Sequence, residues 1–318
     1  MTLQDITFFA SLCWRQPVST AIAVGLDGSA ASMASAHWAA REALRKDLPV
    51  RLVHVWNWQP RRAEAPAERG ARRRRAQQIT REAAVRLRGA YPSLKVVTDQ
   101  MGGQPGAVLP VVAEEAELLV LGSHKVPGLA GFRIGSAALA TAACAERPVI
   151  VTRAGRSREI EQPAAAPGTG SKAARVRDVV LGLDLARACE DLLEFAFATA
   201  LARAATLHVI NGRAASSRPQ PGERAPGLEP STPAPPRTRS QDLTEMLRPW
   251  KEKFPEVAVV EEAVPEGPVE GLLEAAHGAS LLIVGRRASR LPSGWRLGPT
   301  ALAMLHHCAA PVAVVPYT

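Results

Sequence analysis

The sequence predicts an α/β protein of two similar domains, each a five-stranded parallel sheet flanked by helices. The first observation is repetition, because three stretches of the N-terminal half recur in the C-terminal half: VSTAIAVGLD (18–27) as VRDVVLGLD (176–184), ELLVLGS (117–123) as ASLLIVGR (279–286), and ERPVIVT (146–152) as AAPVAVVP (309–316). The second is spacing: equivalent residues of the two copies are 157 residues apart in the first stretch and 163 apart in the other two, as a duplicated unit with loop insertions requires. The third is the alternation of strand-like and helical segments, which indicates parallel strands joined by right-handed crossovers.

The elements of the first repeat follow from local patterns. Residues 21–27 form an almost unbroken apolar run, as a strand buried on both faces requires. Residues 32–45 place Trp38 and Leu44 on one side, which predicts a helix. Pro105 begins another helix, where its missing N–H costs nothing. The predicted strands are 21–27, 50–56, 94–99, 118–122 and 148–152, and the predicted helices are 32–45, 72–88, 105–116 and 135–144.

The second repeat predicts the same order of elements, with strands near Val179, Leu207, Val257, Leu281 and Val312. Composition then divides the chain into an N-terminal extension (1–18), a first domain (19–154), a linker rich in Gly, Pro and Ala (155–174) and a second domain (175–318). Within the second domain, a stretch at about 213–240 that is dense in Pro, Ser and Arg predicts a disordered loop. An inert insertion is a simpler interpretation of this loop than a docking or phosphorylation segment.

Composition points to the cytoplasm. The four cysteines form no C-x-x-C pair and suit a reducing compartment. The first residues lack the basic start of a signal peptide, and no apolar run approaches the ~18 residues of a membrane span. The formal net charge is +9, and much of it lies in residues 61–88. A solvated helix face explains that run better than a nucleic-acid patch, because no aromatic residues are interleaved with it.

One loop carries the chemistry. Residues 122–136 leave a buried strand and enter a helix, at the carboxyl edge where open parallel sheets bind ligands. We expect Gly122 to let the backbone leave the strand without a side chain that would block a ligand. Gly135 and Ser136 lie where the helix begins, so free N–H groups and the helix dipole would favour an anion. Asp27 ends the first strand and would face the same crevice, with a carboxylate able to accept from a ribose hydroxyl or an adenine amine.

These pieces together resemble a tandem universal stress protein, over nearly the whole chain. The matching segments are VGLDGSAASMASAHWAAREAL, RLVHVW, GGQPGAVLPVVAEEAELLVLGSHK, the Gly135-Ser136 helix entry and ERPVIV. The resemblance implies two Rossmann-like domains of the adenine-nucleotide alpha-hydrolase-like group, which bind ATP or a related nucleotide through a G-x2-G-x9-G-[S/T] loop. It implies that Asp27 and Val55 flank the adenosine, that Leu121, Gly122, Ser123, His124 and Lys125 line the start of the loop, and that Gly135 and Ser136 hold phosphates. Mg²⁺ is implied only if ATP is bound.

The chain departs from that loop pattern in both repeats. In the first, Lys125 replaces the second glycine, where its Cβ restricts the loop or its ammonium helps to neutralise phosphate. In the second, Ala288 replaces the same glycine, and Pro299 replaces the serine and removes a donor. Asp184, Gly285 and Gly298 therefore predict a degenerate second site, in a domain that acts as the structural partner of the first.

Other chemistry finds little support in the sequence. His54 and His208 are predicted to occupy equivalent strand positions in the two repeats, as structural histidines. No zincin-type spacing of histidines and no Ser–His–Asp or Cys–His set can be placed, so we expect neither a metal site nor a dedicated enzyme, with slow ATP hydrolysis left open. The last strands, 148–152 and 311–315, would lie at sheet edges in this family and could pair within one chain.

We therefore interpret the chain as a cytoplasmic stress-response module that binds an adenine nucleotide. The alternative is a scaffold or dimerisation module without a nucleotide; a homodimer of whole chains and the identity of a protein partner stay open.

Overall fold

The computed structural model describes residues 21–56, 66–125, 131–153, 177–185, 189–212, 239–264, 268–288 and 297–317. The predicted N-terminal extension (1–18) and linker (155–174) lie outside these residues. So does the predicted loop at 213–240 up to residue 238, after which a helix begins at Arg239. None of the described helices is both long enough and apolar enough to cross a membrane.

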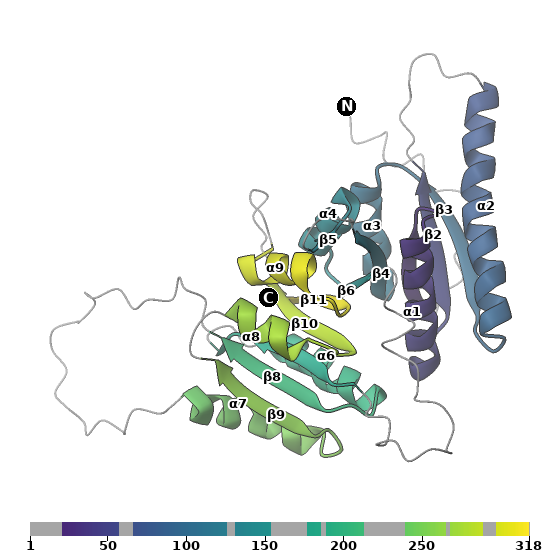
Figure 1. Cartoon of the computed structure of the whole chain (residues 1–318). Helices are drawn as coiled ribbons and strands as arrows, with labels where there is room; N and C mark the ends of the chain where they lie inside the picture. The colour runs from purple at the N-terminus through teal and green to yellow at the C-terminus, as the bar shows by residue number, and fades with distance from the viewer. Residues whose placement is uncertain are drawn as a thin grey trace, which may run out of the picture.

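Each half of the chain forms a five-stranded parallel sheet, which confirms the predicted fold class (Figure 1). The strand order in the first half is β3-β2-β1-β4-β6, and the second half repeats it as β9-β8-β7-β10-β11. The strands are β1 (Ala21–Leu26), β2 (Val50–Trp56), β3 (Val96–Gly102), β4 (Ala116–Lys125), β6 (Val149–Arg153), β7 (Val179–Leu183), β8 (Leu207–Gly212), β9 (Val259–Val264), β10 (Leu281–Arg287) and β11 (Val312–Tyr317).

Helices cover both faces of the sheets, because successive side chains of a buried strand point to opposite faces. Ile22 and Val24 contribute to one apolar core and Ala23 to the other. The first core lies under α1 (Ala30–Lys46), α2 (Pro66–Ala90), α6 (Glu190–Ala202) and α7 (Arg239–Lys253). The second lies under α3 (Pro105–Glu114), α4 (Ser136–Cys144), α8 (Pro268–Ala275) and α9 (Pro299–His307).

The two sheets join through their last strands. β6 pairs with β11 in antiparallel register, with Val151 opposite Val312 and Val149 opposite Val314. The predicted pairing of the two repeats edge to edge is thereby confirmed, and one continuous sheet runs through both halves (Figure 1). Each of these strands would otherwise leave a row of unpaired backbone groups.

A buried ion pair crosses the junction on the α1 side of the sheet. Nη2 of Arg203, at the end of α6, donates to Oε2 of Glu42 in α1 at 2.7 Å, and both side chains are at most 3% exposed. The Arg203 guanidinium also lies 5.3 Å from the ring centroid of Trp38. The two domains are therefore joined by side-chain chemistry as well as by the sheet.

The structure extends or corrects three predictions. β4 continues three residues beyond Gly122, and a short strand that the sequence did not predict, β5 (Phe132–Arg133), pairs with its end. Strand register also shows that His208 does not correspond to His54: His208 pairs with Val180 as Arg51 pairs with Ala23. The true counterpart of His208, Arg51, lies three residues before His54, and the similar apolar residues around both histidines made them look equivalent in the sequence. His54 instead bonds the Leu26 carbonyl oxygen at 2.7 Å, as expected of a structural histidine.

The arginine run at 72–75 lies on α2, where all four residues are exposed, as a solvated helix requires. Charged residues are distributed unevenly between the two domains. Residues 19–154 contain 19 basic residues (Lys and Arg) and 11 acidic residues (Asp and Glu), whereas residues 175–318 contain 16 basic and 16 acidic residues. The excess positive charge therefore lies almost entirely in the first half.

We predict that Glu42→Gln lowers the free energy of unfolding by about 3 kcal/mol, because it leaves the buried Arg203 guanidinium without a compensating charge. Chemical denaturation followed by circular dichroism measures the change. The matched control is Glu245→Gln, which removes an exposed pair with Arg248 and should cost less than about 1 kcal/mol. Equal losses in the two variants would contradict the role assigned to the buried pair.

Candidate functional site

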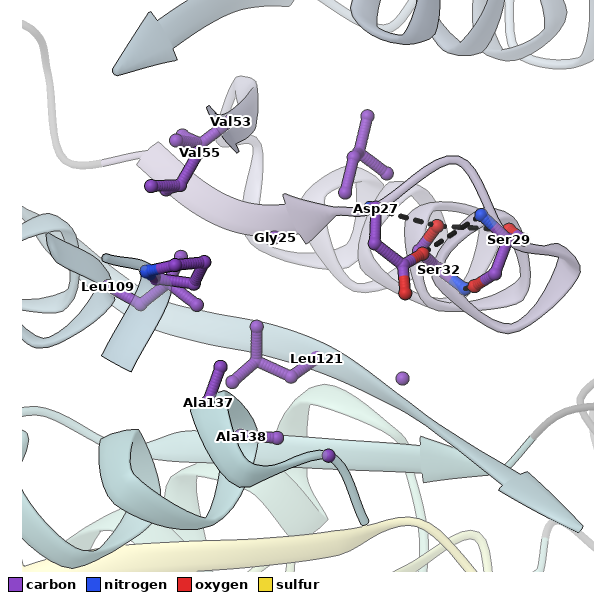
Figure 2. A pocket seen from close by; sticks show the side chains of 14 residues that line it. Gly25, Asp27, Ser29, Ser32, Val53, Val55, Leu109, Leu121, Ala137 and Ala138 are labelled. Atoms are coloured by element: carbon purple, nitrogen blue, oxygen red, sulfur yellow. Dashed lines mark hydrogen bonds between the residues drawn. The ribbon is translucent and has the colours of Figure 1, made fainter. Parts of the chain in front are cut away.

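A cavity of about 170 Å³ lies in the first domain, at the carboxyl edge of its sheet (Figure 2). It lies between the ends of β1, β2 and β4 and the beginnings of α1, α3 and α4. Its lining residues are Gly25, Leu26, Asp27, Ser29, Ser32, Val53, Val55, Pro105, Leu109, Leu121, Gly122, Gly135, Ala137 and Ala138. Apolar side chains from three strands (β1, β2 and β4) and two helices (α3 and α4) form most of this set, and one carboxylate and two hydroxyls gather at one end (Figure 2).

The polar end is built by the first turn of α1. Ser29 is the N-cap of that helix, and its hydroxyl accepts from the Ser32 amide at 3.1 Å. The Ser29 amide in turn donates to Oδ1 of Asp27 at 2.9 Å, and the Ser32 hydroxyl donates to the Ser29 carbonyl at 2.9 Å. The turn between Asp27 and Ser29 contains Gly28 at φ +84°, a conformation that favours glycine. These bonds fix the Asp27 carboxylate beside the cavity.

The Asp27 carboxylate is held in its charged form. Burial acts to raise its pKa, but hydrogen bonds from Ser29 and Ser32 and the charge of nearby His124 outweigh burial, so the pKa lies below its usual value. At neutral pH the group is therefore an anionic acceptor. It can receive hydrogen bonds from hydroxyl or amino groups of a ligand.

The opposite side of the cavity is the beginning of α4. Gly135 is its N-cap, and no side chain caps the helix. The amides of Ser136, Ala137 and Ala138 are the first in the helix and have no partner within it. A Cβ placed on Gly135 would meet no atom of the described residues within 4 Å. The helix thus presents backbone donors and the positive end of its dipole toward the cavity.

The structure separates the residues that the sequence predicted for the site. Asp27, Val55, Leu121, Gly122 and Gly135 line the cavity together. Ser136 is exposed in the first turn of α4, next to the lining residues Gly135 and Ala137.

The other three predicted residues lie beyond the cavity along β4. The Ser123 side chain is buried and is not among the lining residues: its hydroxyl donates to the Thr152 carbonyl at 2.8 Å and accepts from Nη1 of Arg153 at 2.9 Å. His124 is exposed in β4 opposite Arg133. Lys125 lies in the same strand opposite Phe132, and its side chain lies outside the described part of the chain.

Gly122 also has a role in the packing of the fold. The backbone stays in β4 here, and a Cβ on Gly122 would lie 2.8 Å from the carbonyl carbon of Ala31 and 3.0 Å from the amide nitrogen of Ser32. The glycine is therefore required because α1 crosses directly over the strand. By fixing that approach, it positions the first turn of α1 indirectly.

Several lining residues were not identified from the sequence. Val53 is two residues before Val55 and so shares its face of β2, and this alternation could have revealed it. Leu109 lies one helical turn beyond Pro105, on the same side of α3. Ser29 could have been found as a helix N-cap. Ala137 and Ala138 carry no chemical signal, since they contribute backbone and a small side chain.

In the second domain, different residues pack against the corresponding strand ends. Gly212 takes the register position of Val55, and Pro268 packs so closely that a Cβ on Gly212 would lie 2.4 Å from the Pro268 Cβ. The Tyr317 ring lies against Gly285, the counterpart of Gly122, at 2.8 Å from an added Cβ. Gly298 is again an N-cap, but Pro299 follows it and offers no N–H. The degenerate second site at Asp184, Gly285 and Gly298 stays a prediction.

We predict that Gly122→Ala destabilises the protein by about 1–3 kcal/mol, because α1 or β4 must move to admit the methyl group. Gly135→Ala is the matched control and should change the free energy of unfolding by less than about 1 kcal/mol, since its Cβ enters open space. Thermal unfolding of both variants measures the difference. Comparable melting temperatures would show that the contact between Gly122 and α1 does not constrain the fold.

Comparisons with known proteins agree with the tandem arrangement. The sequence profile of the "Universal stress protein family" matches twice, at residues 20–153 and 175–316. A universal stress protein of Mycobacterium tuberculosis H37Rv is 30% identical over 302 residues, covering 92% of this chain and 96% of the relative. A universal stress protein of Mycolicibacterium smegmatis is 27% identical with the same coverage. The crystal structure of a universal stress protein from Archaeoglobus fulgidus superposes with a TM-score of 0.69 at 15% identity, covering 93% of this chain and 98% of that one. The chain therefore belongs to the universal stress protein family, with two family domains in tandem.

Proposed function

We propose that the first domain binds ATP or a related adenine nucleotide, and that the protein acts as a regulatory module of the stress response. The observation that carries the proposal is the combination of three groups around one cavity. An apolar slot, a fixed carboxylate and an uncapped helix N-terminus face it from different sides. A nucleotide offers an aromatic base, a sugar with hydroxyls and an anionic tail, which are the complements of these three groups.

The apolar slot would hold the base. Val53, Val55, Leu109 and Leu121 supply flat, water-excluding contact area (Figure 2). The cavity is smaller than the roughly 300–1,000 Å³ of a usual ligand pocket. It would therefore enclose the base and leave the ribose and phosphates at its mouth.

The polar groups would orient the rest of the ligand. Asp27 would accept from a ribose hydroxyl or from the adenine amine. The free amides at the start of α4 would bind phosphate, with the Ser136 hydroxyl as an additional donor. Binding there would bias the conformation of the segment between Gly122 and Gly135 and so alter a protein contact.

A binding role accounts for these groups better than catalysis. The Asp27 carboxylate is committed to the turn that it stabilises, and its lowered pKa makes it a poor general base. Among the described residues, no three His, Cys, Asp or Glu side chains are grouped closely enough to hold a metal ion. Mg²⁺ would accordingly arrive with the phosphates of ATP.

The rival proposal is a scaffold of the same fold without a nucleotide. The continuous sheet and the buried Glu42–Arg203 pair would serve such a role equally well. The two proposals differ in whether the purified chain binds or carries an adenine nucleotide.

We predict that isothermal titration detects ATP, ADP or AMP binding to the wild-type protein, and that Gly135→Val weakens it by at least about tenfold, or about 1.4 kcal/mol. The valine side chain would occupy the space in front of the α4 amides. Gly298→Val is the matched control, because it places the same side chain at the equivalent N-cap of the second domain. Its dissociation constant should stay within about twofold of wild type. Absence of binding of any adenine nucleotide by wild-type protein would leave the scaffold as the function.

A second prediction separates the nucleoside end from the phosphate end. Asp27→Asn keeps an oxygen for the Ser29 amide but loses the charge, so it should weaken adenosine and ATP by a similar factor, about tenfold. Gly135→Val should weaken ATP but leave adenosine nearly unchanged. Competition titrations with adenosine, AMP and ATP measure these ratios. A loss confined to ATP in the Asp27 variant would place the carboxylate at the phosphates and reverse the proposed orientation.

A further inference from the structure

Arg153 contacts both strands from which the proposed ligand loop emerges. It ends β6 and is 1% exposed. Its Nη1 donates to the Ser123 hydroxyl in β4 at 2.9 Å. Its guanidinium also lies 4.4 Å from the ring centroid of Phe132 in β5. One side chain thus fixes the spacing of β4 and β5 at their paired ends.

The same guanidinium is anchored in the second domain. Nε donates to the Cys308 carbonyl at 2.9 Å and Nη2 to the Met304 carbonyl at 3.1 Å. These carbonyls belong to the C-terminal end of α9, where the Met304 carbonyl also accepts from the amide of the C-cap Cys308. This end of the helix carries the negative end of its dipole. Burial lowers the pKa of Arg153 to about 10, so the group stays charged at neutral pH and suits this end of the helix.

α9 also contacts β5 directly. Nδ1 of His306 lies 3.3 Å from the Phe132 carbonyl. Gly131, at φ +123°, passes so close that an added Cβ would lie 2.8 Å from the His306 carbonyl oxygen. The returning arm of the loop therefore rests on the second domain, and Arg153 links this contact to β4.

We propose that Arg153 is a positioning residue for the ligand site, through which α9 of the second domain sets the relative placement of β4 and β5 in the first. The inference rests on the proposed nucleotide function. Arg153 and α9 do not line the cavity, so they would act by holding β4 and β5 and not by touching the ligand. The second domain, whose own site is degenerate, would then control the affinity of the first. Because such coupling is reciprocal, a bound nucleotide would also tighten the contact between α9 and the loop.

The second domain supplies a matched comparison in Arg286. This arginine is also buried, and it donates across the same interface to the Ala145 carbonyl at the C-terminal end of α4. Ala145 and Cys308 are equivalent positions, 163 residues apart. Each domain thus receives a buried arginine at the end of the same helix. Arg286 reaches the end of α4 that is remote from Gly135, whereas Arg153 reaches the loop itself.

We predict that Arg153→Met in the full-length chain weakens AMP and ATP binding by at least about tenfold, while Arg286→Met stays within about threefold of wild type. Phe132→Ala provides a second variant, because it removes the stacking contact and leaves the bonds from Arg153 to α9 in place. It should weaken binding in the same direction. Isothermal titration well below the melting temperature of each variant measures the dissociation constants. Hydrogen exchange at residues 123–125 and 131–133 measures the order of the two strands, and should accelerate in the Arg153 and Phe132 variants only.

The outcomes separate this inference from the proposed function. Equal loss of binding in Arg153→Met and Arg286→Met would mean that any loosening of the interface suffices, which overturns the specific role of Arg153. Unchanged affinity in both Arg153→Met and Phe132→Ala would overturn it as well. If wild-type protein binds no adenine nucleotide, the proposed function fails. Hydrogen exchange alone then decides whether Arg153 positions β4 and β5. Unchanged exchange in the Arg153 variant would then reject the positioning role, and selective acceleration would retain it for the loop itself.

Discussion

The fold depends on the antiparallel pairing of β6 with β11. A parallel α/β sheet that ends in an open strand leaves backbone donors and acceptors unsatisfied along that edge. Here the duplicated domain supplies the partner, with Ile150 opposite Ala313 at the centre of the register. Side chains on both faces of the sheet also cross this junction between β6 and β11. Glu42 and Arg203 meet on the α1 side, and Arg153 and Arg286 reach helix ends on the other.

This pairing explains how two copies of one unit came to differ. Because the second domain completes the sheet, its strands and core remain necessary even where a ligand site is lost. The replacements fall at the carboxyl edge, where Pro268 packs on Gly212 and Tyr317 on Gly285, and the central apolar strands stay buried. The first domain has a cavity at the equivalent edge of its sheet. Different residues at this edge are therefore compatible with retention of the fold, provided that the edge strand survives.

Much of this architecture was readable from the sequence, because its signals are local or repeated. The apolar run of β1, the alternation of elements and the constant offset between repeats predicted the sheets and their pairing. What escaped prediction depends on contacts between distant residues. Ser123 follows the glycine of a binding motif, yet its side chain faces Arg153, and only the assembled interface reveals this. β5 is two residues long and exists because it pairs with β4 and rests on α9. His208 was matched with His54 by residue type, whereas strand register matches it with Arg51.

The glycines of the loop show why a motif must be interpreted position by position. Gly122 is demanded by the backbone of α1, whether or not a ligand is present. Gly135 has an extended conformation at φ −62° that any residue adopts, and no atom of the described residues lies within 4 Å of a Cβ placed there, so the described part of the fold does not require a glycine at this position. The residue in the place of the second motif glycine, Lys125, lies in an extended strand opposite Phe132, so the backbone there does not require glycine. The departure that the sequence emphasised is therefore compatible with a working loop. The unconstrained glycine at the start of α4 is therefore the position at which the proposed binding is best tested by substitution.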